Sequence, residues 1–115
     1  MIPFPRDLAQ RLGVAGAYAF QVEAEHPAWA GHFPHQPILP GIVQVDWALR
    51  LGEEAFGPLG TFASLEHLKF QALIAPGEPV RLDLRWDATR RELSFTFAGG
   101  EGLKSSGIAR FHAEP

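Results

Sequence analysis

Alternating apolar and charged residues dominate the second half of the chain. Residues 79–87 place Val, Leu, Leu and Trp on one side and Arg, Asp, Arg and Asp on the other, and residues 91–98 continue with the same period. A period of two predicts half-buried β-strands. Residues 17–25 alternate in the same way near the N-terminus. We therefore expect a strand at each of these three places.

Weaker patterns complete the predicted sheet. Residues 61–72 alternate imperfectly, which predicts a strand with a bulge, and residues 103–112 favour a last strand. The sequences Ala-Pro-Gly-Glu at 75–78 and Gly-Gly-Glu-Gly at 99–102 predict turns. Residues 1–13, which carry two prolines and a short apolar-polar stretch, favour one or two helical turns.

An apolar run from Ile42 to Gly52 predicts one long helix, opened by Pro40 and Gly41 and stopped by Gly52, Gly57-Pro58 and Gly60. Polar residues interrupt it at Gln44, Asp46 and Arg50. A helix that is apolar on nearly every face is buried. The order of strand, loop, helix and four antiparallel strands predicts an α+β architecture, with one central helix wrapped by an antiparallel sheet. The other face of that sheet is then left to solvent or to a second subunit.

Composition narrows the class of protein. We expect residues 1–115 to form one domain, near the size at which oligomerisation helps to cover a core. The absence of Cys excludes disulfide scaffolds and thiolate zinc sites. No apolar run approaches the length of a membrane span, and no basic segment followed by an apolar one opens the sequence. These features predict a cytoplasmic protein.

The charge is unevenly distributed. Residues 1–68 hold 3 Lys and Arg against 7 Asp and Glu, whereas residues 69–115 hold 7 against 6, which sums to the net charge of −3. An acidic chain argues against a general nucleic-acid binder. The basic residues of the second half form either a docking surface for an acidic partner or a solvated strand face.

The candidate chemistry lies between residues 26 and 46. Residues 26–41 contain four prolines and therefore form a long loop, and such loops are usually functional. His32 lies in this loop and Asp46 follows 14 residues later in the apolar helix. A carboxyl group is costly to bury unless it is paired or used, and a neutral His accepts a proton. With the free N–H groups near Gly41 at the helix start, these parts suit removal of a proton alpha to a carbonyl and expulsion of a beta hydroxyl.

One motif carries a family resemblance. It reads Gly31-His32-Phe33-Pro34-x-x-Pro37-x-x-Pro40-Gly41-x4-Asp46. It resembles the active-site motif of the 3-hydroxyacyl-acyl-carrier-protein dehydratases of bacterial fatty acid synthesis, a family with the hotdog fold. The helix acid resembles that of the 3-hydroxydecanoyl branch, and the loop prolines resemble the other branch. The likeness continues through Leu68-Lys69-Phe70 and residues 75–78, and extends from about residue 17 to 112.

The resemblance implies roles for individual residues. His32 is the base that takes the alpha proton, Asp46 protonates the leaving hydroxyl, and the Gly41 N–H holds the thioester carbonyl. The Ile38 carbonyl orients the His32 ring. Pocket-lining residues would be Phe33, Pro40 and Trp47, with core packing left open for the aromatic ones, as for Trp29. The site forms across a dimer, with the His from one subunit and the acid from the other, and needs no cofactor.

Two residues depart from the family pattern. His35 replaces a usual Gly; with His32 it could suggest a metal pair, but further ligands at suitable spacing are missing. Arg50 replaces a usual Gln and, at i+4, faces Asp46. A salt bridge there would weaken Asp46 as a proton donor; alternatively, Arg50 points outward to a phosphate. The chain is also short at its N-terminus, as in stand-alone dehydratases of aryl polyene or polyketide-like clusters.

The resulting hypothesis is reversible loss of water from a 3-hydroxyacyl thioester, carried by acyl carrier protein or CoA, to give a trans-2-enoyl thioester. Candidate docking residues for the acidic carrier are Arg50, Lys69, Arg81, Arg85 and Arg110. Two alternatives stay open: a thioesterase on the same fold, and a non-catalytic subunit that pairs with an active homologue. Homodimer and heterodimer are not distinguished. The remaining histidines are expected on the surface or on strands, at His26, His67 and His112.

Overall fold

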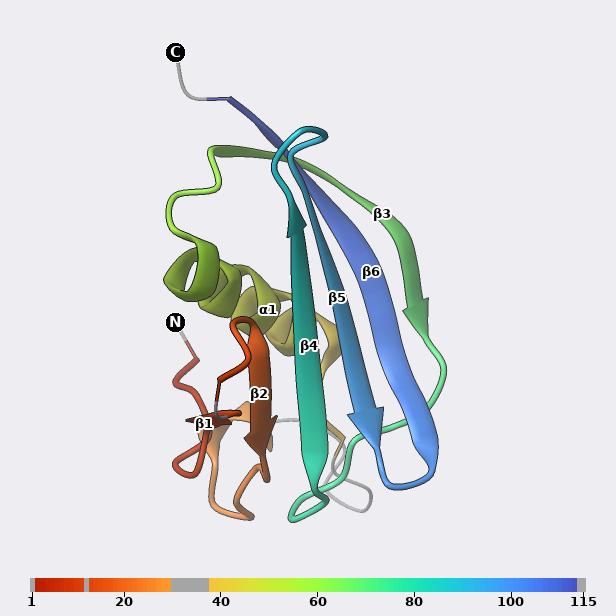
Figure 1. Cartoon of the computed structure of the whole chain (residues 1–115). Coiled ribbons are helices and arrows are strands. Elements are labelled where there is room, and N and C mark those ends of the chain that lie inside the picture. The colour runs from red at the N-terminus through yellow and green to blue at the C-terminus, as the bar shows by residue number, and fades with distance from the viewer. Residues whose placement is uncertain (1, 12, 30–37, 114–115) are drawn as a thin grey trace.

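The computed structural model describes residues 2–11, 13–29 and 38–113, within which one α-helix lies across a six-stranded antiparallel sheet (Figure 1). The helix is α1 (Gly41–Phe56), and the sheet order is β1-β2-β4-β5-β6-β3. The strands are β1 (Ala9–Gln10), β2 (Ala17–Phe20), β3 (Thr61–Phe70), β4 (Val80–Asp87), β5 (Glu92–Gly99) and β6 (Gly102–His112). A short 3-10 turn covers Pro27–Trp29. The expected α+β architecture is confirmed.

The central strands follow the predicted alternation closely. β4 buries Val80, Leu82 and Leu84 and exposes the charged residues between them. In the register of β4 with β5, Leu84 lies opposite Phe95, so that apolar side chains from both strands meet on the face toward α1. β6 confirms the strand predicted over residues 103–112 and begins one residue earlier, at Gly102.

Helix α1 begins where predicted but runs four residues beyond Gly52. A Cβ at Gly52 would come within 2.6 Å of the Leu93 Cδ2 atom. Glycine at this position therefore permits close approach of helix and sheet, and does not end the helix. The end comes at Gly57, whose φ of 81° suits glycine and whose N–H donates to the Glu53 carbonyl at 2.9 Å.

The expectation that α1 is buried all round is wrong on one side. Its core face includes Val43, Trp47 and Leu51, whereas Ile42 is 81% exposed. The helix contacts β4 and β5, and this single sheet covers one side of it (Figure 1). The opposite side of α1 therefore remains open in the isolated chain.

The N-terminal segment forms no helical turns in residues 2–11. Its chain is extended, turns at residues 6–7 and enters β1, where Ala9 pairs with Ala19 of β2. The Asp7 carboxylate accepts the Gln21 N–H at 2.9 Å, which holds this segment against the end of β2. Pairing with the sheet thus overrides the weak helical preference.

Strand β3 is the edge of the sheet and contains the predicted bulge. Its pairing with β6 shifts register twice, between Phe62 and Ser64 and between Glu66 and Lys69. All four of its large apolar side chains are 36–49% exposed, at Phe62, Leu65, Leu68 and Phe70. Within the described ranges, its outer backbone edge has no strand partner.

Candidate active site

The Asp46 carboxylate lies beside an open groove of about 420 Å³ on the uncovered side of α1. The other residues that line this groove are apolar, namely Ile2, Ile42 and Val43. The Asp46 side chain is 40% exposed, so it is reachable from the groove. The arrangement offers one ionisable group beside an apolar surface, which suits a reaction at the polar end of a hydrophobic molecule.

Arg50 holds this carboxylate from one helical turn further on. Its Nε and Nη2 donate to the Asp46 Oδ2 atom at 3.1 and 2.9 Å. Its Nη2 also donates to the Ile2 carbonyl, and the guanidinium lies 4.2 Å from the centre of the Phe4 ring. Of the two orientations left open by the sequence, the structure therefore shows the inward one, paired with Asp46.

The start of α1 lies near the edge strand. Pro40 is the N-cap residue, and its carbonyl accepts the N–H groups of Val43 and Gln44 at 3.1 and 3.2 Å. Among the described residues, no acceptor is found for the Gly41 N–H, as usual in a first helical turn. A Cβ at Gly41 would come within 2.6 Å of the Phe70 ring. The absence of a side chain lets this ring cover the helix start.

A buried chain of hydrogen bonds fixes how the backbone enters α1. The Gln44 amide donates to the Leu39 carbonyl at 3.0 Å and accepts the Ser105 hydroxyl at 2.6 Å. The Leu39 N–H donates to the Ile74 carbonyl at 2.9 Å. In the sequence, Gln44 stands out only as an interruption of the apolar run. The missed signal is that a buried amide requires partners.

Among the other predicted site residues, some lie outside the described residues and some are described away from the groove. His32 and Phe33 lie outside the described residues, as does His35, so their predicted roles stay predictions. Ile38 is described and half-buried, next to Leu39. Trp47 is 1% exposed and packs against Phe20, which favours the core alternative.

The histidine expectations were correct at two of three positions. His67, in the β3 bulge, and His112, at the end of β6, are exposed. His26 is 3% exposed, contrary to the expectation of a surface or strand position. Its Nε2 hydrogen bond to the Pro3 carbonyl, at 2.8 Å, explains why it can be buried in a loop.

The basic docking candidates fall into two groups. Lys69, Arg81 and Arg85 are exposed on β3 and β4. Arg110 forms ion pairs with Glu66 and Glu92, both at 2.7 Å. Arg50 is engaged at Asp46 and Arg110 in its two ion pairs, so Lys69, Arg81 and Arg85 are the candidates without an ion pair among the described residues.

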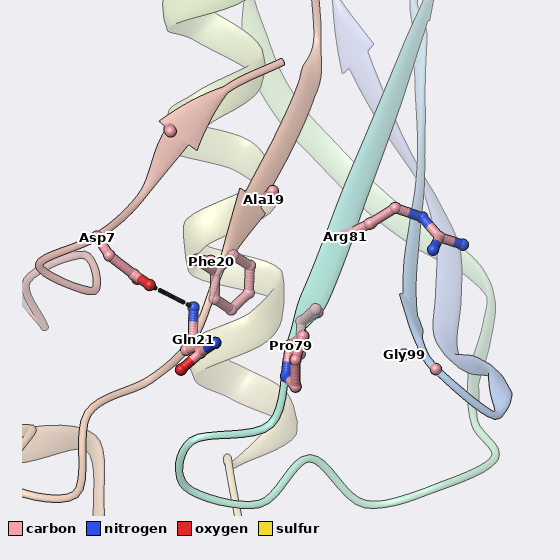
Figure 2. A pocket seen from close by; sticks show the side chains of 10 residues that line it. Asp7, Ala19, Phe20, Gln21, Pro79, Arg81 and Gly99 are labelled. Carbon is pink, nitrogen blue, oxygen red and sulfur yellow. Dashed lines mark hydrogen bonds between the residues drawn. The ribbon is translucent and has the colours of Figure 1, made fainter.

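A second open pocket, of about 380 Å³, lies between β1, β2 and β4 (Figure 2). It is lined by Asp7, Gln21, Pro79 and the Gly99–Gly100 turn, among others, and includes one candidate residue, Arg81. The Asp7 carboxylate accepts the Gln21 N–H, as the dashed line in Figure 2 marks. This pocket lacks an acid and base pair and is not the candidate active site.

In the described part of the chain, no helix is long and apolar enough to cross a membrane. The same residues contain no group of three or more His, Cys, Asp or Glu side chains placed to hold a metal ion.

Comparison with known proteins identifies a matching family and individual proteins of similar sequence. The family described as ApeI-like, ApeI dehydratase, matches residues 13–108. The 3-hydroxyacyl-[acyl-carrier-protein] dehydratase FabZ of Alkaliphilus metalliredigens is 37% identical over 87 residues, covering 70% of this chain and 59% of the relative. FabZ of Caldanaerobacter subterraneus is 29% identical over 100 residues, covering 81% and 64%. The chain thus spans about three-fifths of the length of these relatives.

Solved structures match over nearly the whole chain. The dehydratase heterocomplex ApeI:P from Xenorhabdus doucetiae contains a chain with a TM-score of 0.78 and 28% identity, covering 96% of this chain and 97% of that one. An uncharacterized protein from Erwinia carotovora subsp. atroseptica has a TM-score of 0.75 and 31% identity, covering 96% and 95%. These matches confirm the expected hotdog fold.

Proposed function

This chain belongs to the ApeI-like dehydratase family, and on that premise we propose that it removes water from a 3-hydroxyacyl thioester to give a trans-2-enoyl thioester. The observation that carries the proposal is the Asp46 carboxylate, the one ionisable group among the described residues that line the apolar groove at residues 2, 42 and 43. The relatives named FabZ are 3-hydroxyacyl-[acyl-carrier-protein] dehydratases, which supports the same reaction class.

In the proposed reaction, His32 takes a proton from C2 of the acyl chain. The electrons of that C–H bond form the C2=C3 double bond, and the C3–O bond breaks. Asp46 supplies the proton with which the hydroxyl leaves as water. The Gly41 N–H, in the first turn of α1, hydrogen-bonds to the thioester oxygen as negative charge develops there. Ile38 orients His32 through its carbonyl, and Phe33 and Pro40 line the site.

The proposed carrier of the acyl group is acyl carrier protein, with CoA as the alternative. An acidic carrier would dock on the basic residues of β3, β4 and β6, which are Lys69, Arg81, Arg85 and Arg110. Acidic residues interleave with them, since Asp83 pairs with Arg11 and Arg110 pairs with two glutamates. Docking would therefore be weak and sensitive to salt.

The proposed assembly is a dimer formed through β3. The edge strand offers unpaired backbone groups and four exposed apolar side chains. A second subunit that paired with β3 would continue the sheet and cover these side chains. It would also bring its loop toward this chain's α1, so that His32 of one subunit meets Asp46 of the other.

The nature of the second subunit defines the alternative function. A chain similar to this one is part of the dehydratase heterocomplex ApeI:P. The Arg50–Asp46 ion pair supports a similar role here, because the carboxylate that the reaction needs as its acid is already bound by two hydrogen bonds from Arg50. In this alternative, the chain is a subunit that pairs with an active homologue.

The test of the dehydratase proposal is turnover of a 3-hydroxyacyl carrier-protein substrate, measured by the absorbance of the enoyl thioester. We expect turnover by the wild-type protein, and loss of at least about 100-fold in His32→Ala and in Asp46→Asn. Asp83→Asn is a matched control, because Asp83 also pairs with an arginine but lies on the exposed face of β4.

Two outcomes would decide against parts of the proposal. Absence of wild-type turnover with short, long and aryl acyl groups would refute the stand-alone enzyme, and recovery on adding a homologous subunit would establish the alternative. Wild-type turnover that survives Asp46→Asn would remove Asp46 as the acid and keep the reaction.

A further inference from the structure

Arg50 joins the candidate site to a segment that the family match does not include. The match covers residues 13–108, whereas residues Ile2–Pro5, here called the N-terminal strap, precede it. Arg50 donates to the Ile2 carbonyl and to Asp46, and its guanidinium lies over the Phe4 ring at 4.2 Å. One side chain therefore binds the carboxylate and the strap together.

Two further side chains anchor the same strap. The Trp47 indole N–H donates to the Ile2 carbonyl at 3.4 Å, and His26 Nε2 lies 2.8 Å from the Pro3 carbonyl. His26 Nδ1 accepts the Ala28 N–H at 3.0 Å, so its Nε2 atom carries the hydrogen and donates. Both rings are buried. The strap is thus fixed by its carbonyl groups to α1 and to the segment before the loop.

Among the described residues, one oxygen of the Asp46 carboxylate has no hydrogen-bond partner. Both hydrogen bonds from Arg50 to Asp46 end on Oδ2. Arg50 thereby sets the rotation of the carboxylate and leaves Oδ1 for a molecule in the groove. The side chain of Ile2 lines the same groove, beside Asp46.

We infer that Arg50 is a positioning residue for Asp46, and that the strap it anchors forms a specificity-determining wall of the groove through Ile2. This inference rests on the proposed function and adds to it the residues that select the acyl group. Displacement of the Arg50 side chain would therefore disturb both the Asp46 carboxylate and the position of Ile2. Lysine would not replace it, because an ammonium group lacks the planar fork that reaches a carboxylate and a carbonyl together.

The first experiment compares Arg50→Lys, Arg50→Ala and wild type by steady-state kinetics. We expect kcat to fall on the order of 100-fold in both variants, with a smaller change in KM, because a misplaced acid slows the chemical step. Free guanidinium ion should restore part of the kcat of Arg50→Ala, and methylammonium should not. Arg90→Ala, at an exposed arginine of the β4–β5 turn, is the matched control and should respond to neither. Full activity in Arg50→Lys would overturn the positioning role.

The second experiment tests the wall. Ile2→Ala should shift the ratio of kcat/KM values roughly tenfold toward branched or aryl 3-hydroxyacyl groups over short linear ones. Val14→Ala, at an exposed residue between β1 and β2, should leave the ratio unchanged. An unchanged ratio in Ile2→Ala would overturn the assignment of the wall.

A readout without substrate separates failure of this inference from failure of the proposed function. The Trp47 indole N–H signal in a ¹⁵N-correlated NMR spectrum reports its bond to the Ile2 carbonyl. Arg50→Ala should shift this signal and leave the Trp86 signal in place. If the wild type has no turnover, the proposed function fails; the shift then still supports the anchored strap, and its absence overturns it.

Discussion

The two ends of the sheet differ sharply on the side that faces α1. At β4 and β5, the inward residues Leu82, Leu84, Phe95 and Phe97 are at most 7% exposed. At β3, the residues on the same side are 36–49% exposed, although they are equally apolar. The first region is a complete core within one chain, and the second has the composition of a core without its cover. If the proposed dimer forms through β3, stability of the fold and assembly with a partner depend on different strands.

The largest effect is expected in the complete core. Phe95→Ala should lower the free energy of unfolding by ~3–5 kcal/mol, because it removes a ring that is 1% exposed and leaves a cavity. Phe62→Ala, at a ring that is 48% exposed on β3, should cost less than about 1 kcal/mol in dilute protein. Urea unfolding at low protein concentration measures both. Equal losses would remove the distinction between the two regions.

An acid on the β3 face should separate assembly from folding. Leu65→Asp should convert the proposed dimer to a monomer in light scattering, because a buried unpaired carboxylate is costly in an interface. Its thermal midpoint in dilute solution should stay within a few degrees of wild type. Thr89→Asp adds the same charge in the β4–β5 turn and should leave the dimer intact. A Leu65→Asp protein that remains dimeric would place the interface elsewhere.

A smaller effect on stability is expected from the contacts of Glu78 with Lys104 and with the Ala75 N–H. Burial acts to raise the pKa of Glu78, but the hydrogen bond and charge of Lys104 and the Ala75 N–H outweigh it, so this pKa is lowered from its ordinary value of 4.5. The resulting stabilisation is complete above about pH 4.5, the unfolded value, and is lost as the pH falls through the lower folded value.

Glu78→Gln tests this linkage. We expect it to cost about 1–3 kcal/mol at pH 7 and to flatten the acid limb of the stability curve, measured by urea unfolding between neutral and acidic pH. Glu101→Gln, in the exposed β5–β6 turn, should change neither. An acid limb that persists unchanged in Glu78→Gln would assign it to other carboxylates.

The smallest effect concerns the outer face of the sheet, which both regions share. Arg85→Gln should raise KM for the carrier-protein substrate by a few-fold, and added salt should reduce the difference from wild type. A pantetheine thioester without the protein carrier should show the same KM in both proteins. A salt-independent KM for the carrier substrate would remove electrostatic docking by this face.

Features that depend on neighbouring residues could be predicted from the sequence, and features that depend on residues distant in the chain could not. The alternation in β4 and β5 predicted their burial correctly, because neighbouring residues there alternate between core and solvent. Gly57 was among the predicted stop residues of α1 and does end it. Gly52 was wrongly included among them, because its role depends on Leu93, which reaches it from another strand. The exposure of Ile42 was missed because hydrophobicity does not tell which side of a helix its own sheet covers.

In the candidate site, the contact within one helix could be predicted from the sequence, whereas the contacts between distant segments could not. The spacing of Asp46 and Arg50 indicated their contact as one of two orientations, since residues four apart share a helix face. The contacts of Arg50 with Ile2 and Phe4 had no local signal, because the strap reaches α1 through the tertiary fold. The roles of His32 and Phe33 remain predictions.

The contact between Phe70 and Gly41 links the edge strand directly to the start of α1. A chain that pairs with β3 would press on the Phe70 ring and thereby on the backbone that is proposed to hold the thioester. Short extended peptides that copy β3 would compete for the same edge by strand addition. Such peptides would act as inhibitors without entering the groove. They offer a route to selective control of this protein through its edge strand, β3.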